Sequence, residues 1–93
     1  MCMSIDEMSD ERVAADLSYM ETDTARSGNS FWKWRLPGFQ RELRARLAGM
    51  DAGMAEKFGE EMRQDGLHPR VLALIAERVA DATVVEAAEQ ARV

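Results

Sequence analysis

The segment LHPRVLALIAERVADA, residues 67–82, is the most apolar part of the chain. Pro69 suits the first turn of a helix, because it lacks the N–H group that a helix start leaves unbonded. The apolar residues that follow it form one broad helical stripe, made of Val71, Leu72, Leu74, Ile75 and Val79. We therefore expect a helix here whose apolar face is the centre of the core.

Three earlier segments also repeat apolar residues at helical spacing. The repeats are Val13, Leu17 and Met20 within residues 9–26, Phe39, Leu43 and Leu47 after Pro37, and Met54, Phe58 and Met62 after Asp51. Ser9 and Asp51 are typical N-caps, and Gly49 and Gly66 are expected to end the second and third helices. Gly53 and Gly59 each cost about 1 kcal/mol relative to Ala inside a helix. The third helix therefore depends on packing or on the close approach of a neighbour.

The two ends of the chain leave alternatives open. Thr83 and Glu86 have the spacing of a capping box, so the last residues either form a short fifth helix or continue the fourth. Residues 1–8 form either a separate short turn, with Ser4 and Glu7 as its capping box, or a mobile arm. Residues 27–30, SGNS, are expected to be a loop. The sequence thus predicts one all-α domain over residues 1–93, a small bundle of four or five helices.

Residues 31–36, FWKWRL, do not follow the helical pattern. Trp32, Trp34 and Leu36 alternate with Lys33 and Arg35, which is a period of two. The following proline disfavours helical geometry at the residue before it. An extended aromatic strap that lies across the helices is expected here.

Charge is distributed unevenly along the chain, whose net charge is −5. Residues 1–28 carry −5, residues 29–50 carry +4 and residues 51–93 carry −4. Either these charges neutralise one another within the fold, or the basic segment forms a positive patch that faces a partner.

Several features favour a cytoplasmic location. The single cysteine, Cys2, cannot form a disulfide within the chain, which indicates a reducing compartment. The first ten residues are acidic, unlike a secretory signal, and no apolar run approaches the roughly 20 residues that span a bilayer. We expect no association with membranes.

The residues that usually carry catalysis or hold cofactors are scarce, so we expect a protein that is not an enzyme. His68 is the only histidine, and its place before Pro69 favours a capping or solvent-exposed role over catalysis. Cys2 has no basic neighbour to activate it as a nucleophile. A zinc site needs about four ligands, mainly Cys and His, and the chain has two such residues. No metal and no cofactor is expected, and there is no phosphate-binding glycine loop.

The candidate site is the aromatic and basic stretch FWKWRLPGFQRELRAR, residues 31–46. Trp and Arg are the residues most enriched at protein-binding hot spots. We expect a partner to contact seven residues of this stretch, namely Trp32, Lys33, Trp34, Arg35, Phe39, Arg41 and Arg44. The aromatic residues would anchor the partner, and the cations would set its orientation and association rate.

Two other interpretations of this stretch remain open. Aromatics among cations also suit weak binding of single-stranded nucleic acid, although the helix after Asp51 is too acidic to read a groove. Alternatively Trp32, Trp34 and Phe39 simply close the core, with the arginines paired to Asp16, Glu21 or Glu61.

This pattern favours a small regulator or inhibitor that occludes a partner protein stoichiometrically. The comparison is with the inhibitors of phages and mobile elements, and it rests on analogy of class alone. An accessory subunit of a larger complex is the alternative, and weak nucleic-acid binding is the second alternative. Self-association into an oligomer is compatible with each of them.

Overall fold

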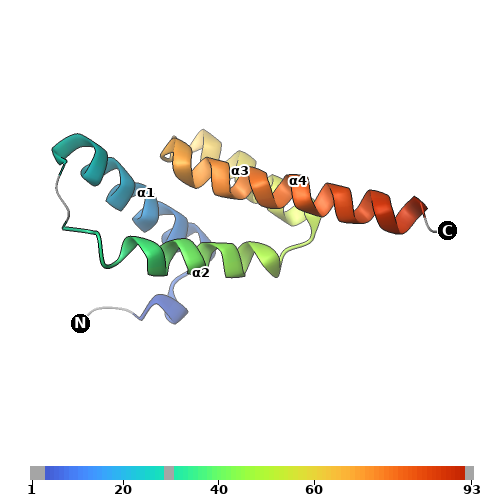
Figure 1. Ribbon diagram of the computed structural model, residues 1–93, viewed down its shortest axis with the longest axis horizontal. Coiled ribbons are helices and arrows are strands. Elements are labelled where there is room, and N and C mark those ends of the chain that lie inside the picture. The colour runs from blue at the N-terminus through green and yellow to red at the C-terminus, as the bar shows by residue number, and fades with distance from the viewer. Residues whose placement is uncertain (1–3, 29–30, 92–93) are drawn as a thin grey trace.

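The computed structural model describes residues 4–28 and 31–91, with the side chains of the last helix described as far as Asp81. The elements are a 3₁₀ turn (Ile5–Glu7), α1 (Asp10–Ser27), α2 (Leu36–Ala48), α3 (Ala52–Gln64) and α4 (Pro69–Ala91). Within the described ranges the chain contains no β-strand. The predicted all-α bundle is therefore confirmed, with four helices over these residues (Figure 1).

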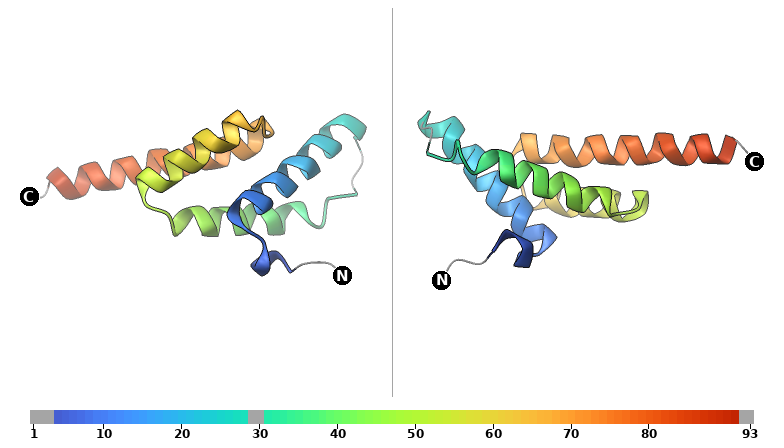
Figure 2. Two further views of the ribbon diagram at one scale, coloured as in Figure 1. Left: turned by 180° about the vertical axis from the view of Figure 1, so that it is seen from behind. Right: turned by 60° about the horizontal axis from the view of Figure 1, so that its bottom comes forward.

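Consecutive helices pair as two hairpins, α1 with α2 and α3 with α4. The hairpins are joined through α4, which also packs against α1 and α2 (Figures 1 and 2). The possible fifth helix is absent, because Thr83 lies inside α4 and the chain continues as one helix to Ala91. Since α3 has 13 residues and α4 has 23, the C-terminal part of α4 extends beyond α3 (Figure 2).

The predicted helix ends are largely confirmed. The Ser9 side chain accepts a hydrogen bond from the Arg12 backbone N–H at 3.1 Å, and the Asp51 side chain accepts one from the Met54 N–H at 2.8 Å. Gly66 follows α3 with φ of 74°, a left-handed conformation that glycine adopts without strain. At the N-terminus the short turn forms, but the Ser4 side chain makes no capping hydrogen bond.

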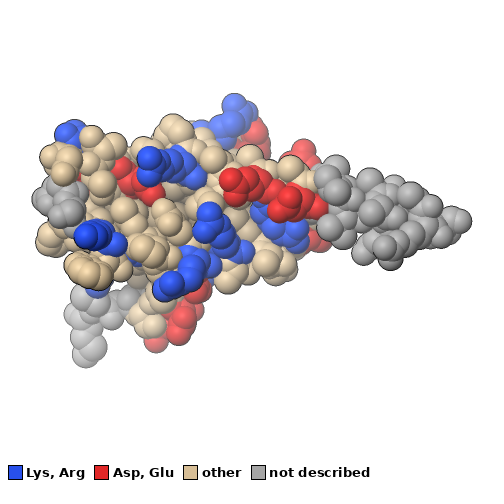
Figure 3. All heavy atoms as spheres, in the orientation of Figure 1, with Lys and Arg blue, Asp and Glu red and all other residues tan. Residues whose placement is uncertain are grey.

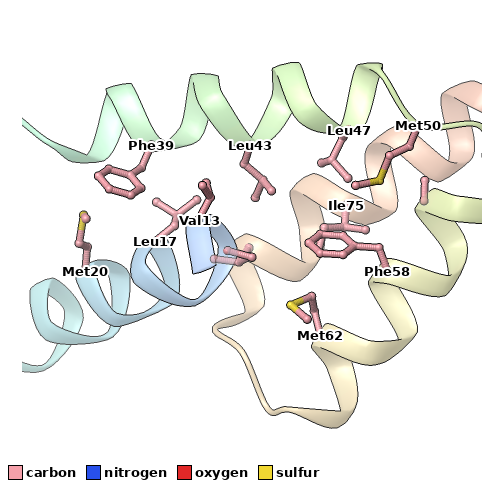
Figure 4. Packing of buried hydrophobic residues seen from close by; sticks show 13 residues of the cluster. Val13, Leu17, Met20, Phe39, Leu43, Leu47, Met50, Phe58, Met62 and Ile75 are labelled. Carbon is pink, nitrogen blue, oxygen red and sulfur yellow. The ribbon is translucent and has the colours of Figure 1, made fainter. Parts of the chain in front are cut away.

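The core lies where the two hairpins meet (Figure 4). All six predicted core residues of α1 and α2 are buried, and they point toward one another and toward α4 (Figure 4). In α4, Val71 and Ile75 are buried, whereas Leu72, Leu74 and Val79 are half-buried. The prediction for Met54 is wrong: its side chain is 58% exposed, and Ala55 is buried in its place. The cause is that α3 turns its 55, 58 and 62 positions toward the core, which is also a helical face.

Polar contacts connect the two hairpins. Arg78 of α4 donates from Nε to the Leu47 carbonyl at 3.0 Å and from Nη2 to the Met50 carbonyl at 3.1 Å. These carbonyls lie at the C-terminus of α2, where a cation is favoured by the helix dipole. His68 donates its backbone N–H to Ser18 Oγ at 2.8 Å, and its Nδ1 accepts from the Arg70 N–H at 3.1 Å. The predicted capping role of His68 is thus confirmed.

The extended strap expected at residues 31–36 is wrong. The Trp32 carbonyl accepts hydrogen bonds from the N–H groups of Arg35 and Leu36, both at 2.9 Å, so the chain coils helically into α2. Pro37 lies in the first turn of α2, where its missing N–H costs nothing. Trp32 then falls on the same helical face as Leu36 and Phe39, while Trp34 lies about 200° away from it around the helix axis. The period of two in the sequence therefore separates the two indoles and does not indicate a strand.

Gly59 is the site of the close helix approach that the sequence suggested for α3. A Cβ added there would lie 2.9 Å from Cγ2 of Ile75, on α4. Ile75 is buried and β-branched, so its side chain has little freedom to move away. The absence of a side chain at Gly59 lets α3 and α4 pack closely.

We expect Gly59→Ala to lower the free energy of unfolding by about 1–3 kcal/mol through this overlap, although Ala is the better helix former. Gly53→Ala is the matched control, because its Cβ would meet only Asp51 Oδ1 at an ordinary 3.5 Å. The control should gain about 0.5 kcal/mol. Urea denaturation measures both, and a Gly59→Ala variant as stable as wild type would contradict the close packing.

Candidate protein-binding surface

The three aromatic residues predicted to bind a partner lie in three different environments. Phe39 is 7% exposed and belongs to the core, so it is not available to a partner in this structure. Trp32 is half-buried, and Trp34 is 85% exposed. The structure therefore does not bring the three rings together as one anchor.

Trp32 holds the connection between α1 and α2 in place. Its indole Nε1–H donates a hydrogen bond to Asp23 Oδ2 of α1 at 2.9 Å. Its ring makes edge-to-face contacts with Tyr19, at 6.0 Å between centroids, and with Phe31, at 4.7 Å. Such pairs add about 0.5–1.5 kcal/mol beyond the area they bury. Trp32 is thus a structural residue that fixes the turn before α2.

Trp34 has no comparable role in the fold. The interaction that the structure gives its ring is with Lys33, whose Nζ lies 5.7 Å from the ring centroid. The large apolar side chains that are exposed in the described part of the chain are Tyr19, Phe31, Trp34 and Met54. Phe31 and Trp34 belong to the 31–35 turn, whereas Tyr19 lies midway along α1 and contacts Trp32. Trp34 is therefore the exposed indole just before α2.

The four predicted cations, Lys33, Arg35, Arg41 and Arg44, are all exposed. Among the described side chains, no carboxylate lies within 4.0 Å of any of them. Two of the acids expected to pair with these cations have other partners. Asp16 pairs with Arg12 at 3.1 Å, and Glu21 lies 3.6 Å from Arg70. Lys and Arg side chains are spread along α2 with uncharged surface between them (Figure 3). We call Lys33, Trp34, Arg35, Arg41 and Arg44 the basic Trp surface.

A groove of about 750 Å³ runs between this surface and the N-terminal residues. It is lined by Ser4, Ile5 and Met8 on the N-terminal side, and by Trp34 and residues of α2 on the other side. Ile5 and Met8 are half-buried against the core, so the N-terminal turn is part of the folded domain. The sequence did not predict this groove, because nothing local indicates that the N-terminal turn lies beside α2.

Arg46 holds the N-terminal turn against α2. It pairs with Glu42, four residues earlier on α2, at 3.0 Å. In addition its guanidinium bonds Asp10 at 3.1 Å, the Ile5 carbonyl at 2.9 Å and the Met8 carbonyl. Burial alone would lower the pKa of Arg46, but the hydrogen bonds and charges of Glu42 and Asp10 raise the pKa above its ordinary value. The guanidinium therefore stays charged in its partly buried position.

Comparison with known protein families, with curated proteins and with solved structures gives no match to this chain. Over the described residues, no three or more His, Cys, Asp or Glu side chains gather where they would hold a metal ion. No helix in those ranges is both long and apolar enough to cross a bilayer. The case for a function therefore depends on the surface itself.

We expect the two tryptophans to differ in their effect on stability. Trp32→Ala should lower the free energy of unfolding by about 2–3 kcal/mol, because it removes a half-buried ring and its hydrogen bond to Asp23. Trp34→Ala should change it by no more than about 0.5 kcal/mol. Urea denaturation followed by circular dichroism measures both. Equal losses in the two variants would show that Trp34 also packs in the fold.

Arg46→Ala should release the N-terminal turn and cost about 2–3 kcal/mol, because two carbonyls and two carboxylates lose a charged partner. Arg44→Ala, on the exposed side of the same helix, is the control and should cost no more than about 0.5 kcal/mol. Hydrogen exchange at the Glu7 and Met8 amides should accelerate in Arg46→Ala alone. Unchanged exchange there would rule out Arg46 as the clamp.

Proposed function

We propose that this protein binds another protein through the basic Trp surface, and that it regulates or inhibits this partner by covering it stoichiometrically. The binding residues are Trp34, Lys33, Arg35, Arg41 and Arg44. Trp32 supports them from within the fold, and Phe39 belongs to the core.

The observation that carries the proposal is the exposure of Trp34. A Trp side chain buries about 150–250 Å² when it packs, which is worth roughly 4–6 kcal/mol at 25 cal/mol per Å². At 85% exposure Trp34 forgoes most of this within its own fold. Two residues earlier, Trp32 packs against Tyr19 and donates a hydrogen bond to Asp23. Trp32 is thus the indole that stabilises this turn, and Trp34 is not needed for that purpose. A partner that covered Trp34 would recover the apolar area that the fold leaves in water.

The unpaired cations suit the same role. In a protein of net charge −5, four cations that have no carboxylate partner among the described side chains mark a local positive field against a negative background. Such charges accelerate encounter with an acidic partner and fix its orientation more than they add affinity. Trp34 would supply anchoring area, and Lys33, Arg35, Arg41 and Arg44 would supply steering.

Two other functions use the same surface and differ in what they predict. An accessory subunit would stay bound at fixed ratio in an assembly that is active only when it is present. Binding of single-stranded nucleic acid is supported by the same exposed indole beside cations, and its affinity would fall steeply as salt rises. A protein partner anchored by Trp34 should tolerate moderate salt.

The test is affinity capture from lysate of the source cells after nuclease treatment, with wild type, Trp34→Ala and Met54→Ala in parallel. Met54 is the matched control, because it is a large apolar side chain 58% exposed on a different helix, α3. We expect one protein to be captured at fixed ratio by wild type and Met54→Ala, and about tenfold less by Trp34→Ala, a loss near 1.4 kcal/mol. Capture that Trp34→Ala retains in full, or that nuclease abolishes, would contradict the proposal.

A further inference from the structure

The groove beside the basic Trp surface has an apolar floor. Ile5 and Met8 contribute from the N-terminal turn, and Gly38 and Ala45 contribute from α2. Gly38 and Ala45 are seven residues apart, so they lie on one face of α2 with Arg41 between them. Trp34 stands at one end of this floor. A volume of about 750 Å³ is within the range of about 300–1,000 Å³ that ligand pockets occupy.

Gly38 keeps the groove open, although the fold does not need glycine there. A Cβ at this position would meet nothing within 4 Å, and the backbone has no positive φ. Glycine within a helix costs about 0.5–1 kcal/mol relative to Ala. Neither packing nor backbone geometry accounts for this residue. What a side chain at Gly38 would change is the free space between α2 and the N-terminal turn.

The α2 side of the groove is positive. Arg35 and Arg41 line it, and neither has a carboxylate partner among the described side chains. Glu42 is the one carboxylate among the described residues that line the groove, and its charge is taken up by Arg46 at 3.0 Å. Asp6 and Glu7, on the opposite side, are exposed and do not line the groove. An occupant would thus meet two free cations, one on each side of the line from Gly38 to Ala45.

We propose that this groove receives an acidic amphipathic helix of the partner protein, with its apolar side chains on the floor and its carboxylates against Arg35 and Arg41. This deepens the proposed function and rests on it. A hydrophobic groove is the usual receptor for the apolar face of an amphipathic helix. The two cations that flank the floor select Glu and Asp beside that apolar face. A strand of nucleic acid, which has phosphates along its length, would pair with the cations but leave the apolar floor uncovered.

The probe is a short synthetic helix peptide with Leu at helical spacing and Glu elsewhere, compared with a scrambled peptide of the same composition and with a peptide that has Lys in place of Glu. Because the whole protein carries −5, unspecific attraction favours the Lys peptide. We expect the reverse: the Glu peptide should bind about tenfold more tightly than either control. Isothermal titration calorimetry with the full chain gives the dissociation constants.

Two pairs of variants locate the binding. Arg35→Glu/Arg41→Glu should invert the preference toward the Lys peptide, whereas Lys57→Glu/Arg63→Glu on α3 makes the same change in net charge and should leave the preference for Glu intact. Gly38→Leu fills the groove and should weaken the Glu peptide about tenfold or more, whereas Ala48→Leu, exposed on the same helix, should not. Circular dichroism confirms that each variant folds.

The outcomes separate this inference from the proposed function. Equal affinity for the Glu and Lys peptides, no binding of the Glu peptide, or full binding by Gly38→Leu would overturn the acidic-helix assignment. A captured partner that needs Trp34 and is weakened by the charge reversal, but tolerates Gly38→Leu, would leave the proposed function standing without this groove. If the Glu peptide binds in the groove but capture of the partner does not depend on Trp34, the groove assignment stands. The proposed role of the basic Trp surface is then contradicted.

Discussion

The hydrogen bond from the Trp32 indole to Asp23 determines how the rest of the surface is presented. It fixes the turn between α1 and α2, and the carbonyl of Trp32 then starts the helical coil that leads into α2. From this start the helical repeat carries Leu36, Phe39 and Leu43 along the inner face. The same repeat turns Trp34 outward. One contact at the end of α1 therefore decides which indole packs in the fold and which meets solvent.

Arg46 has the corresponding role near the C-terminal end of α2. It lies 14 residues after Trp32, and it bonds the backbone carbonyls of Ile5 and Met8 at the N-terminal turn. That contact places Ile5 and Met8 opposite Gly38 and so creates the groove. The energetic core of the molecule is elsewhere, in the packing of α3 on α4 at Gly59 and in the apolar cluster between the hairpins. The surface is thus held by two polar contacts on a framework that packing stabilises.

Much of the fold could be predicted from local signals, because helix periodicity, caps and stop glycines act over a few residues. Local signals of this kind predict the caps at Ser9 and Asp51 and the left-handed Gly66. They do not predict that Met54 is exposed, because two helical faces one residue apart fit the same apolar spacing and only packing chooses between them. The 31–36 segment is not a strand, because aromatic and basic residues can also alternate in a helical turn when one indole packs inward and the other faces solvent. Apart from Glu42, the partners of Arg46 are 36–41 residues distant in sequence, and no local pattern carries that information.

The central claim is that Trp32 is structural and Trp34 is a free contact residue, and iodide quenching of tryptophan fluorescence tests it most directly. Trp32→Phe leaves Trp34 as the only indole, and Trp34→Phe leaves Trp32. The structure predicts that Trp34 emits at the wavelength of an indole in water and is quenched readily, while Trp32 emits at shorter wavelength and resists quenching. Addition of the captured partner should shield Trp34 alone. Equal protection of the two indoles in the free protein would contradict the account, since both would then pack within the fold.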